Sequence, residues 1–346
     1  MEAEGRTNQE AVASLLAEAD EGAPPFWEAG EHINVRTDGA DLRVIHCAPS
    51  RPCGGRPVVL VPGFGVIPEG FQEFYRAVHG RADFFYVETR EKASSRLSHH
   101  ADMSIHRMAR DLAEVLPAIG LGDGADFVLT AVCWGATIAL EGLMAGNLHV
   151  PTLMACDPMH ALYFPRWFLR WVSPVLPLPV VRAMRPLVFA AMLGDMREPV
   201  QKQRARDFVY SADVAKWKRA AEAARDVELC GRLHAVAEEV FVLNGTADKV
   251  HDPALYPLLA AEMPRGRFLF METQEHLRER LFGTAALAFS RVRAGDGLPA
   301  ALTPFERALQ RQDQQRPPRL PARRGHAPPH GLSSQGRPRQ APRHRP

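Results

Sequence analysis

Several signals that would assign this chain to a special class of protein are missing from its sequence. The five cysteines are odd in number and form no C-x-x-C pair, so neither a disulfide framework nor a zinc site is indicated. A reducing, cytoplasmic compartment is therefore expected. The acidic N-terminus lacks the basic start and apolar block of a signal peptide. We also find no internal repeat.

A long uninterrupted apolar run is missing as well. The most apolar stretch extends from Tyr163 to Gly194, and its five prolines and four arginines argue against a membrane-spanning helix. We interpret this stretch first as the core of a helical segment. Its tryptophans and phenylalanines would also suit an acyl pocket or a peripheral contact with a membrane surface, and both alternatives stay open.

Charge of one sign dominates only at the C-terminus. Residues 311–346 contain nine arginines, no lysine, one aspartate and no glutamate, a net charge of +8. The rest of the chain therefore carries −6 of the overall +2. A mildly acidic body gives no reason to expect nucleic-acid binding. We expect residues 311–346, rich in Arg, Pro, Gln and Gly, to be a disordered tail.

What the sequence does contain is an alternation of apolar strands and amphipathic helices. A hairpin signal surrounds Asp38-Gly39, and "PVVLVPGFG" and "DFVLTAVC" then read as buried strands. The segment "SIHRMARDLAEVLPAIG" reads as a helix that begins after Ser104 and stops at Gly120. This rhythm predicts an α/β fold, with a mostly parallel sheet of about eight strands and helices on both faces.

The alternation stops near Met159 and resumes with the strand "EVFVLNG". We therefore interpret residues 159–235 as a helical cap inserted into a core of residues 31–158 and 236–295. Residues 1–30 form an N-terminal helical extension in this interpretation. The chain of 346 residues is long enough for such a single large domain.

Three strand ends carry the residue types that catalysis would need. The strand "DFVLTAVC" runs directly into the helix "WGATIAL", with Cys133 at the junction. A turn this tight presents a nucleophile, and it requires small residues two positions before and after, where Ala131 and Gly135 stand. Asp248 follows a later strand, and His276 follows the last one. The chain order is thus nucleophile, acid, histidine.

On these residues the sequence resembles the α/β-hydrolase superfamily over roughly residues 58–294. The usual nucleophile box G-x-S-x-G appears as Ala131-Val132-Cys133-Trp134-Gly135, and the loop after the first parallel strand appears as Pro62-Gly63-Phe64-Gly65. The resemblance implies that the backbone amides of Phe64 and Trp134 form an oxyanion hole. It also implies a catalytic triad in which Asp248 orients His276, the base that activates Cys133.

Two departures from the family pattern stand out. The family turn D-x-R-G-x-G-x-S appears as residues 88–95, with Arg90 and Ser95 in place and both glycines missing. A cysteine in the nucleophile box is a minority form, known in polyhydroxyalkanoate synthases and dienelactone hydrolases. Beyond the box, the sequence shows no further match to either of these.

The expected function is cleavage of a small hydrophobic acyl substrate, a carboxylic ester or a thioester, through an acyl-enzyme on Cys133. The resemblance implies no metal and no organic cofactor. Transfer of the acyl group to an acceptor other than water is one alternative. A non-catalytic homologue that binds a hydrophobic ligand, with Cys133 as an inert buried residue, is another. Asp157, which directly follows the apolar run "TLMAC", is a rival for the acid, because some α/β-hydrolases place the acid after this strand.

Overall fold

The computed structural model describes residues 10–17, 19–49, 51, 53–161, 165–193, 198–244, 254–271 and 277–309, with only the backbone of 191–193. The expected tail at 311–346 lies outside these residues, and so do Asp248 and His276. Residues 10–16 are helical, within the N-terminal extension expected from the sequence.

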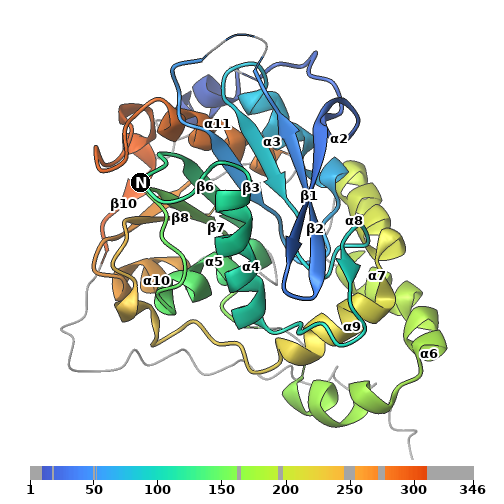
Figure 1. The fold of residues 1–346 in the computed structure, drawn as a ribbon. Helices are drawn as coiled ribbons and strands as arrows, with labels where there is room; N and C mark the ends of the chain where they lie inside the picture. The colour runs from blue at the N-terminus through green and yellow to red at the C-terminus, as the bar shows by residue number, and fades with distance from the viewer. Residues whose placement is uncertain are drawn as a thin grey trace, which may run out of the picture. The chain divides into compact units, whose positions relative to one another are not determined.

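Within the described residues, ten strands form a single sheet (Figure 1). They are β1 (Glu31–Thr37), β2 (Ala40–Cys47), β3 (Val58–Val61), β4 (Phe84–Val87), β5 (Arg96–Leu97), β6 (Val128–Val132), β7 (Leu153–Cys156), β8 (Val240–Asn244), β9 (Gly266–Phe270) and β10 (Glu306–Arg307). The order is β1-β2-β4-β3-β6-β7-β8-β9-β10, and β5 pairs with β2. Eight of these strands have four or more residues, as the sequence predicts.

The sheet is parallel from β4 to β9 and antiparallel at both edges. The expected hairpin is confirmed: Thr37 pairs with Ala40, and Gly39 has a φ of 73°, which glycine adopts without steric cost. The parallel strands all point the same way, so their carboxyl ends line up at one end of the sheet. In folds of this kind, ligand-binding sites form at the carboxyl ends of the strands.

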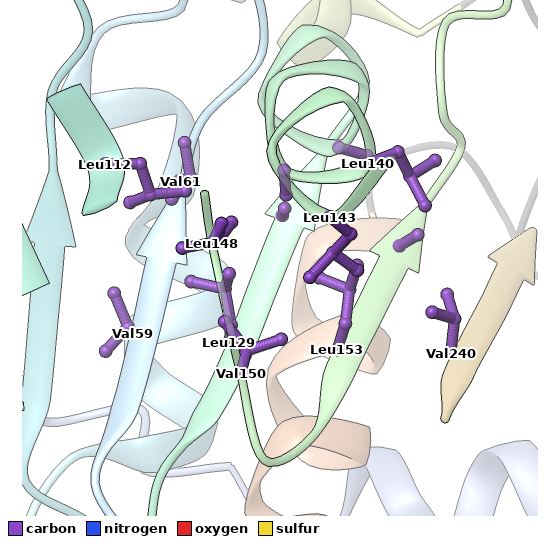
Figure 2. Packing of buried hydrophobic residues seen from close by; sticks show 14 of the residues in the cluster. Val59, Val61, Leu112, Leu129, Leu140, Leu143, Leu148, Val150, Leu153 and Val240 are labelled. Atoms are coloured by element: carbon purple, nitrogen blue, oxygen red, sulfur yellow. The ribbon is translucent and has the colours of Figure 1, made fainter. Parts of the chain in front are cut away.

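Side chains of the central strands are buried on both faces, which explains their continuous apolar sequences. Val59 and Val61 of β3 belong to one core, together with residues of α4 (Ile105–Ala118), α5 (Trp134–Met144) and α10 (Tyr256–Glu262). Figure 2 shows the two valines with Leu112 of α4 and Leu140 of α5. Val58 and Leu60 point to a second core, with α3 (Gln72–Val78) and α11 (Arg278–Ser290). The alternation places one helical layer on each face of the sheet, as expected.

Helix α4 has the boundaries that its sequence predicts. The Ser104 side chain accepts a hydrogen bond from the Arg107 amide at 3.2 Å, which makes it the N-cap. The helix ends at Ala118, and Gly120 follows with a φ of 84°. Shorter helical segments on the core are α2 (Phe26–Ala29) and η1 (Pro68–Phe71).

The described chain between β7 and β8 is largely helical. It contains η2 (Phe168–Val172), η3 (Ser173–Val175), α6 (Leu178–Ala183), α7 (Arg185–Leu193), α8 (Pro199–Ser211), α9 (Val214–Ala223) and η4 (Leu233–Ala235). In Figure 1 α6, α7, α8 and α9 lie together at one side of the sheet. We refer to them, with η2 and η3, as the cap.

No single helix among the described residues is long and apolar enough to cross a membrane. One pair of helical segments, Phe168–Val175 and Leu178–Ala190, passes the same test of length and composition together, but it is bent by 111°.

The packed chain continues beyond residue 295, where the sequence analysis ends the core. The segment η6 (Ala300–Phe305) buries Leu302 and Phe305 completely against the second core. β10 then pairs antiparallel with β9, and Arg267 of β9 binds Glu306 through two hydrogen bonds of 2.8 and 3.0 Å. This segment therefore completes the far edge of the sheet.

Candidate active site

The backbone at Cys133 has the conformation of a nucleophile elbow. Cys133 joins β6 to α5 with φ 51° and ψ −110°. Among the described residues other than glycine, only Cys133 and Asp157 have positive φ. Such backbone angles cost of order 1–3 kcal/mol and persist where the surrounding structure enforces them, commonly at functional sites. The strain predicted from the sequence is therefore present at Cys133.

Close packing explains the small residues around the elbow. A Cβ built on Gly135 would lie 2.7 Å from the Pro62 carbonyl oxygen and closer still to that of Val61, so α5 nearly touches the end of β3. Ala131, two residues before Cys133, is fully buried and pairs with Val61 across β3 and β6. A larger side chain at either place would push the strand and the helix apart.

Three hydrogen bonds hold the elbow in place. The Cys133 amide donates to the Cys156 carbonyl at 2.8 Å, which extends the pairing of β6 with β7. The Met159 amide donates to the Cys133 carbonyl at 3.3 Å. The Thr137 hydroxyl lies 2.7 Å from the Met159 carbonyl and 3.1 Å from that of Cys133. The chain after β7 thus supports the turn from the outside.

The loop after β3 lies directly against Cys133, as the resemblance implies. A Cβ on Gly63 would sit 3.4 Å from the Cys133 Cβ and 3.7 Å from the Val132 carbonyl oxygen. Trp134 is the first residue of α5, so its amide has no acceptor within the helix and is available to a ligand. Phe64 packs its ring on that of Trp134, with centroids 6.0 Å apart. The two expected oxyanion-hole residues are therefore neighbours.

A buried ion pair lies beneath this loop. Glu91 and Lys92 lie in the turn that resembles D-x-R-G-x-G-x-S, and Glu91 takes the place of its first glycine. Both side chains are almost fully buried. The Lys92 Nζ donates a hydrogen bond to the Gly63 carbonyl and lies 3.2 Å from Glu91 Oε1. The same Glu91 oxygen accepts hydrogen bonds from the Thr89 hydroxyl at 2.6 Å and the Gly65 amide at 3.3 Å. The pair therefore holds the loop from below.

Lys92 also contributes positive charge to the site. Burial lowers the pKa of Lys92 from its usual value, while the neighbouring Glu91 carboxylate raises it in part. A buried ammonium here favours negative charge that develops on a bound carbonyl oxygen. The sequence analysis missed this pair, although the replaced glycines marked its position.

Replacing Lys92 with methionine should destabilise the protein by about 2–3 kcal/mol, because it leaves the Glu91 carboxylate buried without its counter-charge. The double variant Glu91→Gln/Lys92→Met removes both charges and should recover most of that loss. Urea unfolding of the two variants and the wild type measures the difference. A double variant less stable than Lys92→Met would contradict the ion pair as the cause.

The cap contacts the same loop from above. Trp217 of α9 lies so close to Gly65 that a Cβ on that glycine would overlap the indole ring. The Trp217 ring also packs on Phe64, at a centroid distance of 5.4 Å. Lys216 donates hydrogen bonds to the carbonyls of Lys92 at 2.8 Å and Ala93 at 3.0 Å. Gly65, with its φ of 64°, is thus required both by the turn and by the packing.

Asp157 follows β7, one strand along the edge from Cys133. Its carboxylate is buried and accepts a hydrogen bond from the Asn244 amide group at 2.6 Å. Arg278 Nη1 lies 3.7 Å from the other carboxylate oxygen. Cys133 and Asp157 therefore directly follow the adjacent strands β6 and β7, and Asn244 is the last residue of the next strand, β8. The rival acid named in the sequence analysis does lie at the same edge as the nucleophile.

The structure neither places nor excludes the other two members of the predicted triad. Asp248 and His276 fall in the segments 245–253 and 272–276, outside the described residues. The segments begin after Asn244, the last residue of β8, and after Met271, one residue beyond β9. Both assignments therefore remain predictions from the sequence.

Three of the other cysteines, Cys47, Cys156 and Cys230, have thiols with a raised pKa. All five are free of disulfide bonds. Burial raises the pKa of the Cys47 thiol, and that of Cys156 well above its usual value. Burial likewise raises the pKa of Cys230 to about 12. These three thiols are therefore poor nucleophiles at neutral pH. No cluster of three His, Cys, Asp or Glu side chains suited to a metal occurs among the described residues.

A cleft of about 720 Å³ lies elsewhere, between residues 97–100 and α9. It is lined by Leu97, Ser98, His99, His100, Asp213, Ala215, Lys216 and Arg219. None of these residues belongs to the elbow or to the loop after β3, and most of them are polar or charged. We therefore do not assign an apolar acyl group to this cleft.

Comparisons with known proteins identify the fold. No family model and no curated protein matches the chain. Solved structures do, among them an α/β hydrolase from Sphaerobacter thermophilus (TM-score 0.55, 18% identity, 74% of this chain and 99% of that one). An esterase from Exiguobacterium antarcticum gives a TM-score of 0.60 at 18% identity, over 75% and 97% of the two chains. An enol-lactonase from Burkholderia xenovorans gives 0.58 at 15%, over 74% and 99%.

The chain therefore has the α/β-hydrolase fold, as the sequence analysis expects. Sequence identities of 15–18% show a shared fold and do not establish the chemistry of the site.

Proposed function

We propose that this protein transfers acyl groups through Cys133 and hydrolyses a hydrophobic carboxylic ester or thioester. The observation that carries the proposal is the strained backbone of Cys133 at the start of α5, φ 51° and ψ −110°. A buried structural cysteine would need no such conformation. Two of the similar solved structures are an esterase and an enol-lactonase, which supports the hydrolase assignment.

In the proposed reaction, His276 takes the proton of the Cys133 thiol as the sulfur attacks the substrate carbonyl carbon. The Phe64 and Trp134 amides stabilise the oxyanion that forms. The carbon–oxygen or carbon–sulfur bond to the leaving group then breaks, and the leaving group takes the proton back from His276. The product is a thioester between the acyl group and Cys133. Water, deprotonated by His276, releases the carboxylic acid and restores the thiol.

Asp248 is the residue that we assign to orient His276. Among the described residues, the Asp157 carboxylate accepts a hydrogen bond from the Asn244 amide group and lies 3.7 Å from Arg278. The partly exposed rings of Phe64 and Trp217 beside the loop after β3 favour a hydrophobic acyl group. No step of the proposed reaction requires a metal or an organic cofactor.

Mass spectrometry tests the proposal. The protein is incubated with p-nitrophenyl esters and acyl-CoA thioesters of several chain lengths, and the reaction is stopped with acid. We expect the acyl mass on the peptide that contains Cys133, and none on those with Cys47 or Cys156, whose pKa is raised by burial. The Cys133→Ala variant is the control and should carry no adduct.

The same experiment separates the competing functions. Free carboxylic acid as the product supports hydrolysis, whereas acylation of an added alcohol or thiol in preference to water supports an acyltransferase. The absence of both an adduct and turnover at every chain length would contradict an enzyme of this kind. That result would support a homologue that only binds a hydrophobic ligand.

A further inference from the structure

The outer side of the cap exposes an unusual set of apolar side chains. We call residues 165–190, which comprise η2, η3, α6 and most of α7, the cap arm. Trp167, Trp171 and Val175 are 63%, 72% and 75% exposed. Trp167 and Trp171 are four residues apart, close to one turn of the π-helical η2, so they lie on the same side of it, and Val175 follows in the 3-10 turn η3. Exposed tryptophans are uncommon, and two on one face indicate a binding surface.

The opposite face of the same segment already has a partner. Leu169 and Ser173 are buried, and the Ser173 hydroxyl donates a hydrogen bond to Glu222 of α9 at 2.7 Å. The Lys218 Nζ of α9 contacts the Pro174 carbonyl at 3.5 Å. Since the inner face rests on α9, the tryptophan face cannot be part of the cap's own core.

The exposed apolar surface continues past the 111° bend into the second limb of the arm. Leu178 and Val180 of α6 are exposed, and so is Leu187 of α7. Figure 1 shows α6 at the outer edge of the cap, away from the sheet. The bend makes the arm two short limbs, and each of them exposes apolar side chains.

The charges of the arm all have one sign. From Pro158 to Leu193 the sequence has four arginines and no aspartate, glutamate or lysine. Arg166 and Arg170 lie 3.3 and 3.7 Å from Glu228 and Asp226, at the border with the rest of the protein. Arg182 is exposed on α6, and among the described residues no ion-pair partner is found for it. The surface of the arm is therefore apolar and cationic.

We propose that the cap arm docks on the surface of a lipid bilayer that carries anionic headgroups. Tryptophan and arginine together suit the membrane interface, where an indole ring enters the headgroup region and a guanidinium binds phosphate. A second copy of this chain fits less well, because the same acid-free cationic surface would then face itself. The docking is peripheral and does not depend on the reactivity of Cys133.

Vesicle co-sedimentation tests this proposal with the full chain. One set of vesicles is phosphatidylcholine alone, and the other is an equal mixture of phosphatidylcholine and phosphatidylglycerol. The protein should partition onto the mixed vesicles and shift its tryptophan fluorescence to the blue. The double variant Trp167→Ser/Trp171→Ser should have a partition coefficient lower by about tenfold or more. The matched control, Val200→Ser/Tyr210→Ser on α8, removes two exposed apolar side chains outside the arm and should change little.

A charge reversal separates the electrostatic part. Arg182→Glu should weaken binding to the mixed vesicles by about tenfold. Arg36→Glu, which reverses a side chain 87% exposed on β1, is the matched control. Equal partitioning of Trp167→Ser/Trp171→Ser and its control, or no binding to either vesicle, would overturn the proposal. A dimer in solution that only the tryptophan variant loses would also overturn it. Because binding is measured without substrate, these outcomes are independent of the proposed catalysis.

Discussion

Replacing Cys133 with alanine is expected to lower kcat/KM for a hydrophobic ester by about 10⁴-fold or more. In the proposed mechanism, the variant loses the sulfur that forms the acyl-enzyme and keeps the amides of Phe64 and Trp134 that bind the carbonyl oxygen. Stability should change little, because alanine keeps the Cβ and therefore the same backbone strain at φ 51°. Initial rates with p-nitrophenyl esters, together with urea unfolding, measure both quantities.

Two further variants make this prediction specific. Cys133→Ser should change kcat/KM by at least about tenfold, because a hydroxyl ionises far less readily than a thiol in the same place. Cys53→Ser, at another half-buried cysteine, should leave the rate unchanged. If Cys133→Ala keeps the wild-type rate, another residue carries the reaction and the elbow is only structural.

Replacing Asp111 with alanine is expected to lower the free energy of unfolding by about 3–5 kcal/mol, because it leaves two buried cations without their shared anion. Asp111 of α4 and Arg90 are almost completely buried, and Arg90 binds this carboxylate through both Nε and Nη2. Arg107 binds it too, at 3.0 and 3.1 Å. Arg90 also donates to the carbonyls of Asp38 and Asp102, so the cluster joins the first hairpin to α4.

Urea denaturation measures this loss. Asp111→Asn keeps the size of the side chain and one acceptor oxygen, so it should lose less than Asp111→Ala. It also provides a measurable variant if alanine prevents folding. Asp41→Ala is the matched control, because Asp41 forms an ion pair with Arg36 at the surface and should change stability by no more than about 0.5 kcal/mol. A loss at Asp111 no larger than that of the control would contradict the role of the cluster.

The sheet and the elbow could be predicted because their signals are local. The central strands read as apolar runs because both of their faces are buried, and the hairpin follows from Asp38-Gly39 alone. Gly135 stands two residues after Cys133 because a Cβ there would meet backbone oxygens. Each of these features depends on a few neighbouring residues, so a single sequence displays it.

Other features depend on residues far apart in the chain. Leu302 and Phe305 are isolated apolar residues in a segment rich in proline, and only the second core shows that they are buried. The core therefore extends beyond the residue 295 expected from the sequence, and β10 was not predicted. Arg90 was identified from a family turn, but its partner Asp111 could not be, because no local pattern links the two. Asp248 and His276 remain predictions that the described residues do not test.

By itself, the sequence determined the order of the central strands and helices, the place of the nucleophile turn and the composition of the cap arm, because periodicity, glycine and charge act over short distances. Only the tertiary structure decided which side chains of separate elements contact one another. It brought Lys92 under the Gly63 carbonyl and Trp217 over Gly65, and it turned Trp167 and Trp171 outward while burying Leu169. Such contacts depend on how separate elements pack, and the free energy of packing is a property of the whole fold.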